Sequence, residues 1–270
     1  MITLKVESEV MGYFELETAV VRLNETTWEA NLVPGWRIGE MMNGGYLLAI
    51  AGRVLGEALP QSDPLSINAF YLAPAFVGPI RCEVEILRLG KNTSQAVVKM
   101  IQNNELKVQV TGACTDLDRL SGPTWIRTPR PDIPEWDDLP STPNKAIELG
   151  SRMDLRLSQG QSFLQDGKGD GRGEFQGWIG HSDGSPTDAL SLLFFADAFP
   201  PPAFSLFGAV GWVPTIELTV QVRAKPAPGP IQAALWSNYL TEGITEEDGL
   251  FWDNTGKLVA ISRQSAKVRA

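Results

Sequence analysis

The sequence repeats itself at a separation of 151 residues, from position 78 to position 229. Gly78-Pro79-Ile80 recurs as Gly229-Pro230-Ile231, and the same shift lays residues 101–113 over residues 252–264. Both longer segments alternate apolar and polar residues on either side of a tight polar turn, a pattern that predicts a β-hairpin. A chain with two copies of one unit must fold into an architecture that can be built twice.

Each copy also has a helix pattern followed by a strand pattern. Residues 43–60 are apolar with a period of 3.6, and residues 185–200 are apolar on almost every side. Alternating strands follow at residues 66–74 and 215–226. We therefore expect two units, each with one long helix that covers the apolar face of about four antiparallel strands.

Local signals refine the elements next to both helices. Ser185 is the expected N-cap of the second helix, with Pro186 at its first position and Asp188 closing a capping box. Ahead of the first helix we expect a further strand or two, over residues 12–22 and 27–33.

Prolines mark the boundary between the units. Residues 121–145 contain six prolines and charges of both signs, which is typical of a linker. The expected organisation is an N-terminal unit over residues 1–120, this linker, and a C-terminal unit over residues 146–270. The expected fold class is α+β.

Charge and hydropathy narrow the range of partners. The net charge of −9 repels polyphosphate backbones and anionic membrane surfaces. We find no leader pattern at the start and no apolar run of about 18 residues that would span a bilayer. The expectation is a cytoplasmic protein that binds neither nucleic acid nor membranes. Cys82 and Cys114 lack metal-binding spacing and are interpreted as buried free thiols, although a bridge between neighbouring strands also fits.

Residues 180–184, GHSDG, match the pentapeptide that presents a nucleophilic serine in many hydrolases. A serine nucleophile needs a base, usually a histidine, elsewhere in the site. His181 is the one histidine in the chain, and it lies inside the motif itself. We therefore interpret the segment as a polar turn ahead of the second helix, and we do not expect Ser182 to be a nucleophile.

Taken together, the ordered segments resemble the double hot-dog acyl-CoA thioesterases of the thioesterase II type. The resemblance rests on an ordered set of segments: NGGYLLAIAG, FYLAPAFVGPIRCEVEILRLGKNTSQA, a second apolar helix that ends in an aspartate, PTIELTV and GKLVAISRQ. It implies a double hot-dog fold and hydrolysis of acyl-CoA to free acid and CoA, with no metal or cofactor. In that family an Asp, a Thr and a Gln of the second unit hold the attacking water, and these fall on Asp197, Thr215 and Gln264.

The chemistry of these side chains is compatible with that role. Asp197 follows apolar helix positions, so burial should raise its pKa, as expected of a general base. Gln264 shares a strand face with small and apolar residues and therefore needs hydrogen-bond partners. Thr215 can bridge a water to a carboxylate, although threonine is also a common strand residue. Structural roles for all three remain open: an aspartate turned to solvent, a glutamine bonded to the backbone and an ordinary strand threonine.

The first unit offers a possible substrate-binding element and an internal comparison. Asn43, Gly44 and Gly45 begin the first helix, whose free N–H groups could polarise a thioester carbonyl or bind phosphate, or simply form a flexible helix entry. The repeat sets first-unit residues opposite the second-unit triad: Glu57 opposite Asp197, Ser66 opposite Thr215 and Ala113 opposite Gln264. Only the second unit therefore has the complete set.

The leading hypothesis is a metal-independent acyl-CoA thioesterase without a covalent intermediate. The alternative is a non-catalytic hot-dog module that binds an acyl-CoA or an aromatic ligand. A hydratase or dehydratase is disfavoured because it would need an Asp-His pair. The resemblance also implies a homodimer or a higher homo-oligomer. Arg88, Lys91, Lys267 and Arg269 are candidates for contact with the CoA phosphates, although each also fits a solvated surface charge.

Overall fold

The computed structural model describes residues 11–142, 147–159, 167–209 and 211–269. The first half contains helices α1 (Tyr13–Glu17) and α2 (Gly44–Ala58) and strands β1 (Val20–Arg22), β2 (Thr27–Leu32), β3 (Arg37–Ile38), β4 (Met41–Met42), β5 (Asp63–Tyr71), β6 (Gly78–Arg88), β7 (Thr93–Gln102) and β8 (Glu105–Thr115). The second half contains helices α4 (Ala189–Phe195) and α5 (Pro202–Phe207) and strands β9 (Met153–Gln159), β10 (Glu174–His181), β11 (Thr215–Val222), β12 (Ile231–Trp236), β13 (Leu240–Thr241), β14 (Ile244–Trp252) and β15 (Leu258–Lys267).

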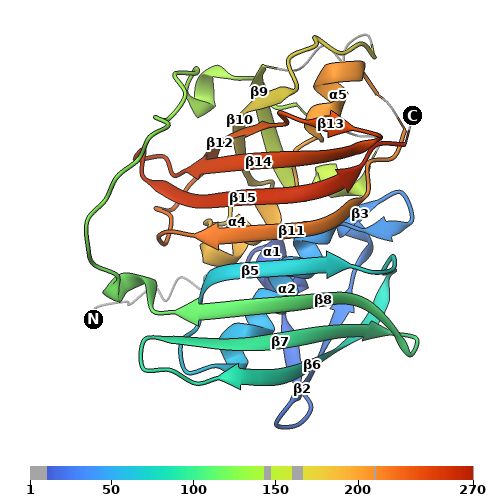
Figure 1. Cartoon of the computed structure of the whole chain (residues 1–270), viewed down its shortest axis with the longest axis vertical. Coiled ribbons are helices and arrows are strands. Elements are labelled where there is room, and N and C mark those ends of the chain that lie inside the picture. Colours follow the sequence, from blue (N-terminus) through green and yellow to red (C-terminus); the bar gives the residue numbers. More distant parts are fainter. Residues whose placement is uncertain (1–10, 143–146, 160–166, 210, 270) are drawn as a thin grey trace, which may run out of the picture.

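Thirteen strands of the described residues form one antiparallel sheet, which is continuous through both units (Figure 1). Its order is β1-β2-β6-β7-β8-β5-β11-β15-β14-β12-β10-β9, with β13 beside β14. The two halves of this order mirror each other about the junction of β5 and β11, where Asn68 pairs with Thr219. The internal repeat is therefore a structural repeat.

Backbone geometry explains why the repeated motif keeps its glycine. Gly78 and Gly229 have φ values of +120° and +128°, a conformation that side-chain-bearing residues rarely adopt. In the first hairpin, Asn103 and Asn104 both have positive φ, as a two-residue turn requires. Both predicted hairpins are present, β7–β8 and β14–β15.

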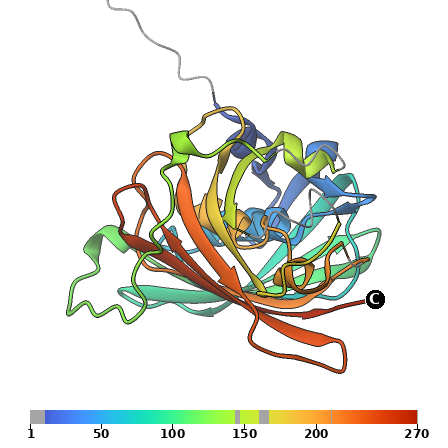
Figure 2. The ribbon, with the colours of Figure 1, turned by 90° about the horizontal axis from the view of Figure 1, so that it is seen from above.

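Helices α2 and α4 lie on the concave side of the sheet, which curves around them in the view of Figure 2. They pack against each other in antiparallel directions, because Gly45 contacts Phe194 whereas Gly52 contacts Leu190 and Leu193. The absence of side chains at the two glycines allows this close approach. Buried residues from both helices and from the inner face of the sheet form one core, in which each fully buried large side chain contributes about 1.5–3 kcal/mol.

A helix wrapped by an antiparallel sheet, present twice in one chain, is the double hot-dog architecture. The α+β fold expected from the sequence is confirmed, including one helix followed by four main strands in each unit. No helix in the described ranges is long and apolar enough to cross a membrane.

The limits predicted for the second helix are wrong. α4 begins at Ala189 and its N-cap is Asp188, whose carboxylate accepts from Ser191 N at 2.7 Å. Ser191 Oγ in turn accepts from the backbone N–H of Asp188 at 3.1 Å. The capping box therefore forms three residues further along the chain than expected. The side chain of Ser185 takes no part in this capping box, which is formed by Asp188 and Ser191. At the other end a turn and three consecutive prolines, 200–202, stop the helix.

The strand predicted over residues 12–22 is present only at its end, as β1 (Val20–Arg22), whereas the strand over 27–33 is confirmed as β2. Residues 13–17 form α1, because Phe14 inserts into an aromatic cluster with Trp36 and Phe194. The side chain of Asp183 accepts from Tyr13 N at 2.6 Å and satisfies a free N–H at the start of this helix.

The proline-rich segment packs on the second unit from Arg130 onward, whereas residues 121–129 are exposed. Residues 143–145 of the proposed linker lie outside the described residues. Trp178 Nε1 donates to the carbonyl of Pro134 at 3.0 Å, and the Arg156 guanidinium lies 3.9 Å from the ring centroid of Trp136. The two cysteines are buried free thiols, as expected, and burial raises the pKa of each to about 12.

Candidate active site

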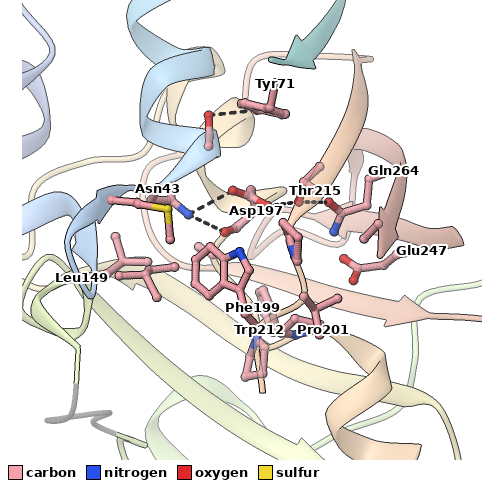
Figure 3. A pocket seen from close by; sticks show the side chains of 18 of the residues that line it. Asn43, Tyr71, Leu149, Asp197, Phe199, Pro201, Trp212, Thr215, Glu247 and Gln264 are labelled. Carbon is pink, nitrogen blue, oxygen red and sulfur yellow. Dashed lines mark hydrogen bonds between the residues drawn. The ribbon is translucent and has the colours of Figure 1, made fainter. Parts of the chain in front are cut away.

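A cavity of about 690 Å³ opens where the two units meet. The N-terminus of α2, the turn after α4 and one end of strands β11, β14 and β15 surround it (Figure 3). One part of its wall is apolar and carries three methionines: Ile38, Met41, Met42, Leu47, Ile147, Leu149, Met153 and Leu155. Another part is polar and contains Asn43, Asp197, Thr215, Glu247 and Gln264.

Asp197 lies in the turn two residues beyond the end of α4, at the contact between the units. Its Oδ2 accepts from Gly45 N at 2.9 Å and from Asn43 Nδ2 at 3.0 Å. The same Asn43 amide donates to the main-chain carbonyl of Asp197 at 2.8 Å. The first unit therefore holds the carboxylate of the second.

Burial raises the pKa of the Asp197 carboxyl to about 6, although several hydrogen bonds oppose the effect. Donation from Gly45 N is the largest of these, followed by Thr215, Gly44 N and Asn43. The positive end of the α2 dipole acts in the same direction as these bonds. A carboxylate with a pKa near 6 is ionised at neutral pH and is basic enough to accept a proton from water.

Thr215 and Gln264 lie beside this carboxylate. Thr215 Oγ1 is 2.7 Å from Gln264 Oε1 and 3.5 Å from Asp197 Oδ1, so the hydroxyl can donate to either (Figure 3). Gln264 is buried on the inward face of β15, as the strand pattern predicts. The structure thus brings all three residues of the second-unit set into one cavity.

The start of α2 is also present at the site. Asn43 is the N-cap and accepts from Tyr46 N at 2.9 Å. A Cβ at Gly44 would lie 2.9 Å from both Asp197 Oδ2 and the Tyr71 ring, and one at Gly45 would lie 2.5 Å from the carbonyl oxygen of Phe194. Both positions therefore require glycine. The sequence predicts that the N–H of Gly45 is available to a substrate, but in this structure it donates a hydrogen bond to Asp197.

The first-unit position that corresponds to Gln264 is closed by neighbouring side chains. Leu218 pairs with Gln264 and Ile67 pairs with Gly112, so the register sets Gly112 rather than Ala113 opposite Gln264. A side chain at Gly112 would collide with Leu55. Glu57 accepts from Trp28 Nε1 at 2.8 Å. The connection between β14 and β15 is one residue longer than that between β7 and β8, since Trp252 pairs with Leu258 whereas Ile101 pairs with Leu106, and this accounts for the one-residue difference from the sequence alignment.

The GHSDG segment lies outside the cavity. Ser182 Oγ donates to the carbonyl of Ser151 at 2.7 Å, and the segment forms the predicted turn after β10. His181 is buried against Phe14 and forms a 2.9 Å hydrogen bond with Ser191 Oγ. Burial lowers the pKa of His181 to about 4, so this residue is a neutral core histidine.

Sequence reasoning missed two polar groups of the cavity, Tyr71 and Glu247. Tyr71 OH donates to the carbonyl of Gly44 at 2.9 Å. Glu247 is buried on β14 directly opposite Gln264. Alternation along residues 244–252 could have indicated an inward Glu247, but only the strand register shows what it faces. Arg269, one of the candidates for phosphate contact, lines the cavity and is exposed.

Comparison with known proteins agrees with this architecture. The model of the acyl-CoA thioesterase N-terminal domain matches residues 32–115, and that of the acyl-CoA thioesterase C-terminal domain matches residues 127–268. A crystal structure from Thermobifida fusca, provisionally assigned to thioesterase II, is 31% identical with a TM-score of 0.88, over 96% of this chain and 98% of that one.

Two further relatives are more distant. A protein of unknown function with a hot-dog fold from Alicyclobacillus acidocaldarius is 20% identical with a TM-score of 0.87, over 97% of this chain and 99% of that one. An uncharacterised protein of Mycobacterium tuberculosis is 26% identical, over 90% of this chain and 91% of its own length.

Fold and cavity define a double hot-dog protein in which the second unit carries the polar site. The chain belongs to the acyl-CoA thioesterase family, whose N- and C-terminal domain models match it in order. Its domains are those of a thioester hydrolase.

Proposed function

We propose that this protein hydrolyses acyl-CoA thioesters to the free acid and CoA, with Asp197 as the general base. The observation that carries the proposal is the convergence of Asp197, Thr215 and Gln264 on one cavity, linked by hydrogen bonds. The apolar, methionine-containing wall of the same cavity suits a flexible acyl chain.

The reaction is a single displacement by water. Thr215 and Gln264 hold a water molecule beside Asp197, and its oxygen attacks the thioester carbonyl carbon while Asp197 takes one proton. The tetrahedral intermediate then breaks the C–S bond, and the CoA thiolate receives the proton from Asp197. The positive end of the α2 dipole at Gly44 and Gly45 favours the oxyanion that forms as Asp197 loses its own charge.

Kinetics on a panel of acyl-CoA substrates, with the released thiol detected by a chromogenic disulfide, tests the proposal. Asp197→Asn and Gln264→Ala should each lower kcat by roughly 10² or more, because general base catalysis is typically worth that much. Ser182→Ala is the control and should retain wild-type kcat, since Ser182 lies outside the cavity.

Full activity of both site variants would refute the assignment of the base and the water-holding amide. Tight binding of acyl-CoA without release of thiol would favour the alternative, a non-catalytic binding module. The buried thiols of Cys82 and Cys114 keep the background of the assay low.

A further inference from the structure

Glu247 is a second carboxyl group in the cavity, and the proposed reaction gives it no role. It lies on β14, where it pairs across the sheet with Gln264 of β15. Both side chains are buried and line the cavity, and the Glu247 carboxyl lies next to the Gln264 side chain (Figure 3). Directly opposed residues of antiparallel strands have Cβ atoms about 4.5–5.5 Å apart, within reach for a side-chain hydrogen bond.

The amide of Gln264 can be useful in only one of its two orientations. Its Oε1 faces the hydroxyl of Thr215 at 2.7 Å, so its Nε2 must donate elsewhere. Thr215 cannot enforce this orientation, because a hydroxyl can accept as well as donate. The Gln264 side chain acts to lower the pKa of Glu247, as an amide N–H directed at a carboxyl group does, and the cross-strand pairing places Glu247 where it can supply the missing acceptor.

We propose that Glu247 is a positioning residue of the hydrolytic site: it accepts from Gln264 Nε2 and thereby keeps Gln264 Oε1 turned toward Thr215. This inference rests on the proposed function, since it concerns the amide that holds the attacking water. A row of side chains from β14, β15 and β11 then leads from Glu247 through Gln264 and Thr215 to Asp197.

The two carboxyl groups differ in their protonation. Burial raises the pKa of Glu247 to about 8; the bond from Gln264 lowers it, whereas the charges of Asp197 and Asp248 raise it further. Arg269 is the cationic residue in the described lining of the cavity, and Asp248 is paired with Arg263 at 2.6 Å. At neutral pH Asp197 is therefore ionised and Glu247 is protonated.

This pairing gives the rate a defined pH dependence. As pH rises through about 6, Asp197 becomes the active carboxylate and kcat/KM increases. As pH rises through about 8, Glu247 becomes a second buried anion, which disfavours the developing oxyanion, and kcat/KM falls. The two carboxyl groups, with separated pKa values, thus limit kcat/KM at both the acid and the alkaline end of the pH range.

Three variants test the proposal in steady-state kinetics between pH 5 and 10. Glu247→Leu removes the acceptor and should lower kcat about 10-fold to 100-fold with little change in KM, as loss of a supporting hydrogen bond commonly does. Glu247→Gln can still accept from Gln264 and should retain wild-type kcat at pH 7 within about threefold. It should lose the fall in activity above pH 8, which a merely structural residue would not control.

Asp248→Asn is the matched control, because it removes a carboxylate from the adjacent position of the same strand, where Asp248 pairs with exposed Arg263. It should keep an alkaline limb, shifted to lower pH because the charge of Asp248 no longer raises the pKa of Glu247. If Glu247→Gln shows the same alkaline limb as the wild type, or if Glu247→Leu is fully active, the proposal is wrong.

A readout without substrate separates this inference from the proposed function. The side-chain amide NMR signals of Gln264, assigned with Gln264→Ala, should titrate near pH 8 in the wild type and stay constant in Glu247→Gln. If no thioester is hydrolysed but this titration is seen, the proposed function fails and the positioning role stands. If the Gln264 amide signals of the wild type do not titrate near pH 8, or titrate equally in Glu247→Gln, the positioning role is refuted whether or not the enzyme is active.

Discussion

The contact between α2 and α4 supports a quantitative prediction about Gly45. A Cβ at this position would lie 2.5 Å from the carbonyl oxygen of Phe194 and 3.0 Å from Cβ of Asp197. A carbon atom and a carbonyl oxygen normally approach to about 3.3 Å. Since the obstacle is main chain, Gly45→Ala must push the two helices apart by roughly 0.8 Å.

Gly52 provides a matched comparison on the same helix. A Cβ there would lie 2.6 Å from Cδ1 of Leu193, the end of a side chain that can rotate away. Alanine in a helix is favoured over glycine by about 1 kcal/mol, which offsets this small rearrangement. Gly52→Ala should therefore stay within about 1 kcal/mol of the wild type.

Overpacking against main chain typically costs about 1–3 kcal/mol, so Gly45→Ala should lose up to about 2 kcal/mol after the gain in helix propensity. For a chain of this size the loss corresponds to a fall in Tm of up to about 8 °C. The displacement also moves Asp197 away from its donor, and misplacement by about 1 Å can cost 10² in rate. We expect kcat to fall by about that factor in Gly45→Ala alone.

Thermal unfolding followed by circular dichroism, with kcat measured at saturating acyl-CoA well below either Tm, checks both effects. If Gly45→Ala matches Gly52→Ala in Tm and in kcat, the close approach of the helices does not position the carboxylate.

Two further predictions concern charge. Asp197→Asn should stabilise the protein at pH 8 by up to about 3 kcal/mol but not at pH 4, measured as Tm across pH. With a folded pKa of about 6, the carboxyl contributes stability below its unfolded pKa and loses it as pH rises through about 6. Equal shifts at both pH values would contradict this. Arg269→Ala should raise KM for an acyl-CoA about threefold at unchanged kcat, because one exposed phosphate contact is lost. The N-acetylcysteamine thioester of the same acid lacks the phosphates and should show no change; an equal rise in its KM would exclude that contact.

The sequence predicted those parts of the fold that depend on local pattern. Alternation and turn residues identified both hairpins, and the shift between the GPI motifs identified the duplication. The ends of the second helix were misjudged because Ser185 and Asp188 both fit a cap, and only tertiary packing of residues 189–195 decides between them. Residues 13–17 were misjudged because Phe14 and Asp183, far apart in sequence, stabilise a helix together.

The residues of the second-unit site came from resemblance and strand periodicity, and the structure brings them together. Their support from the first unit could not be predicted, because the Asn43–Asp197 bond joins residues with no shared local pattern. Glu247 was missed for a similar reason: its partner is fixed by the register of β14 and β15, which a single sequence does not specify.

The junction of β5 and β11 has a consequence for how such a protein can change. In a symmetric pair of identical subunits every substitution appears at two sites at once. A residue that improves one site for its role is therefore also present at the other site, where it can be unfavourable. Here the two copies share one chain but vary independently, and the position that holds Gln264 in one copy is Gly112, closed by Leu55, in the other. Fusion thus permits a division of labour in which the first copy gives up the amide and supplies the support, Asn43 and Gly45, on which the carboxylate of the second depends.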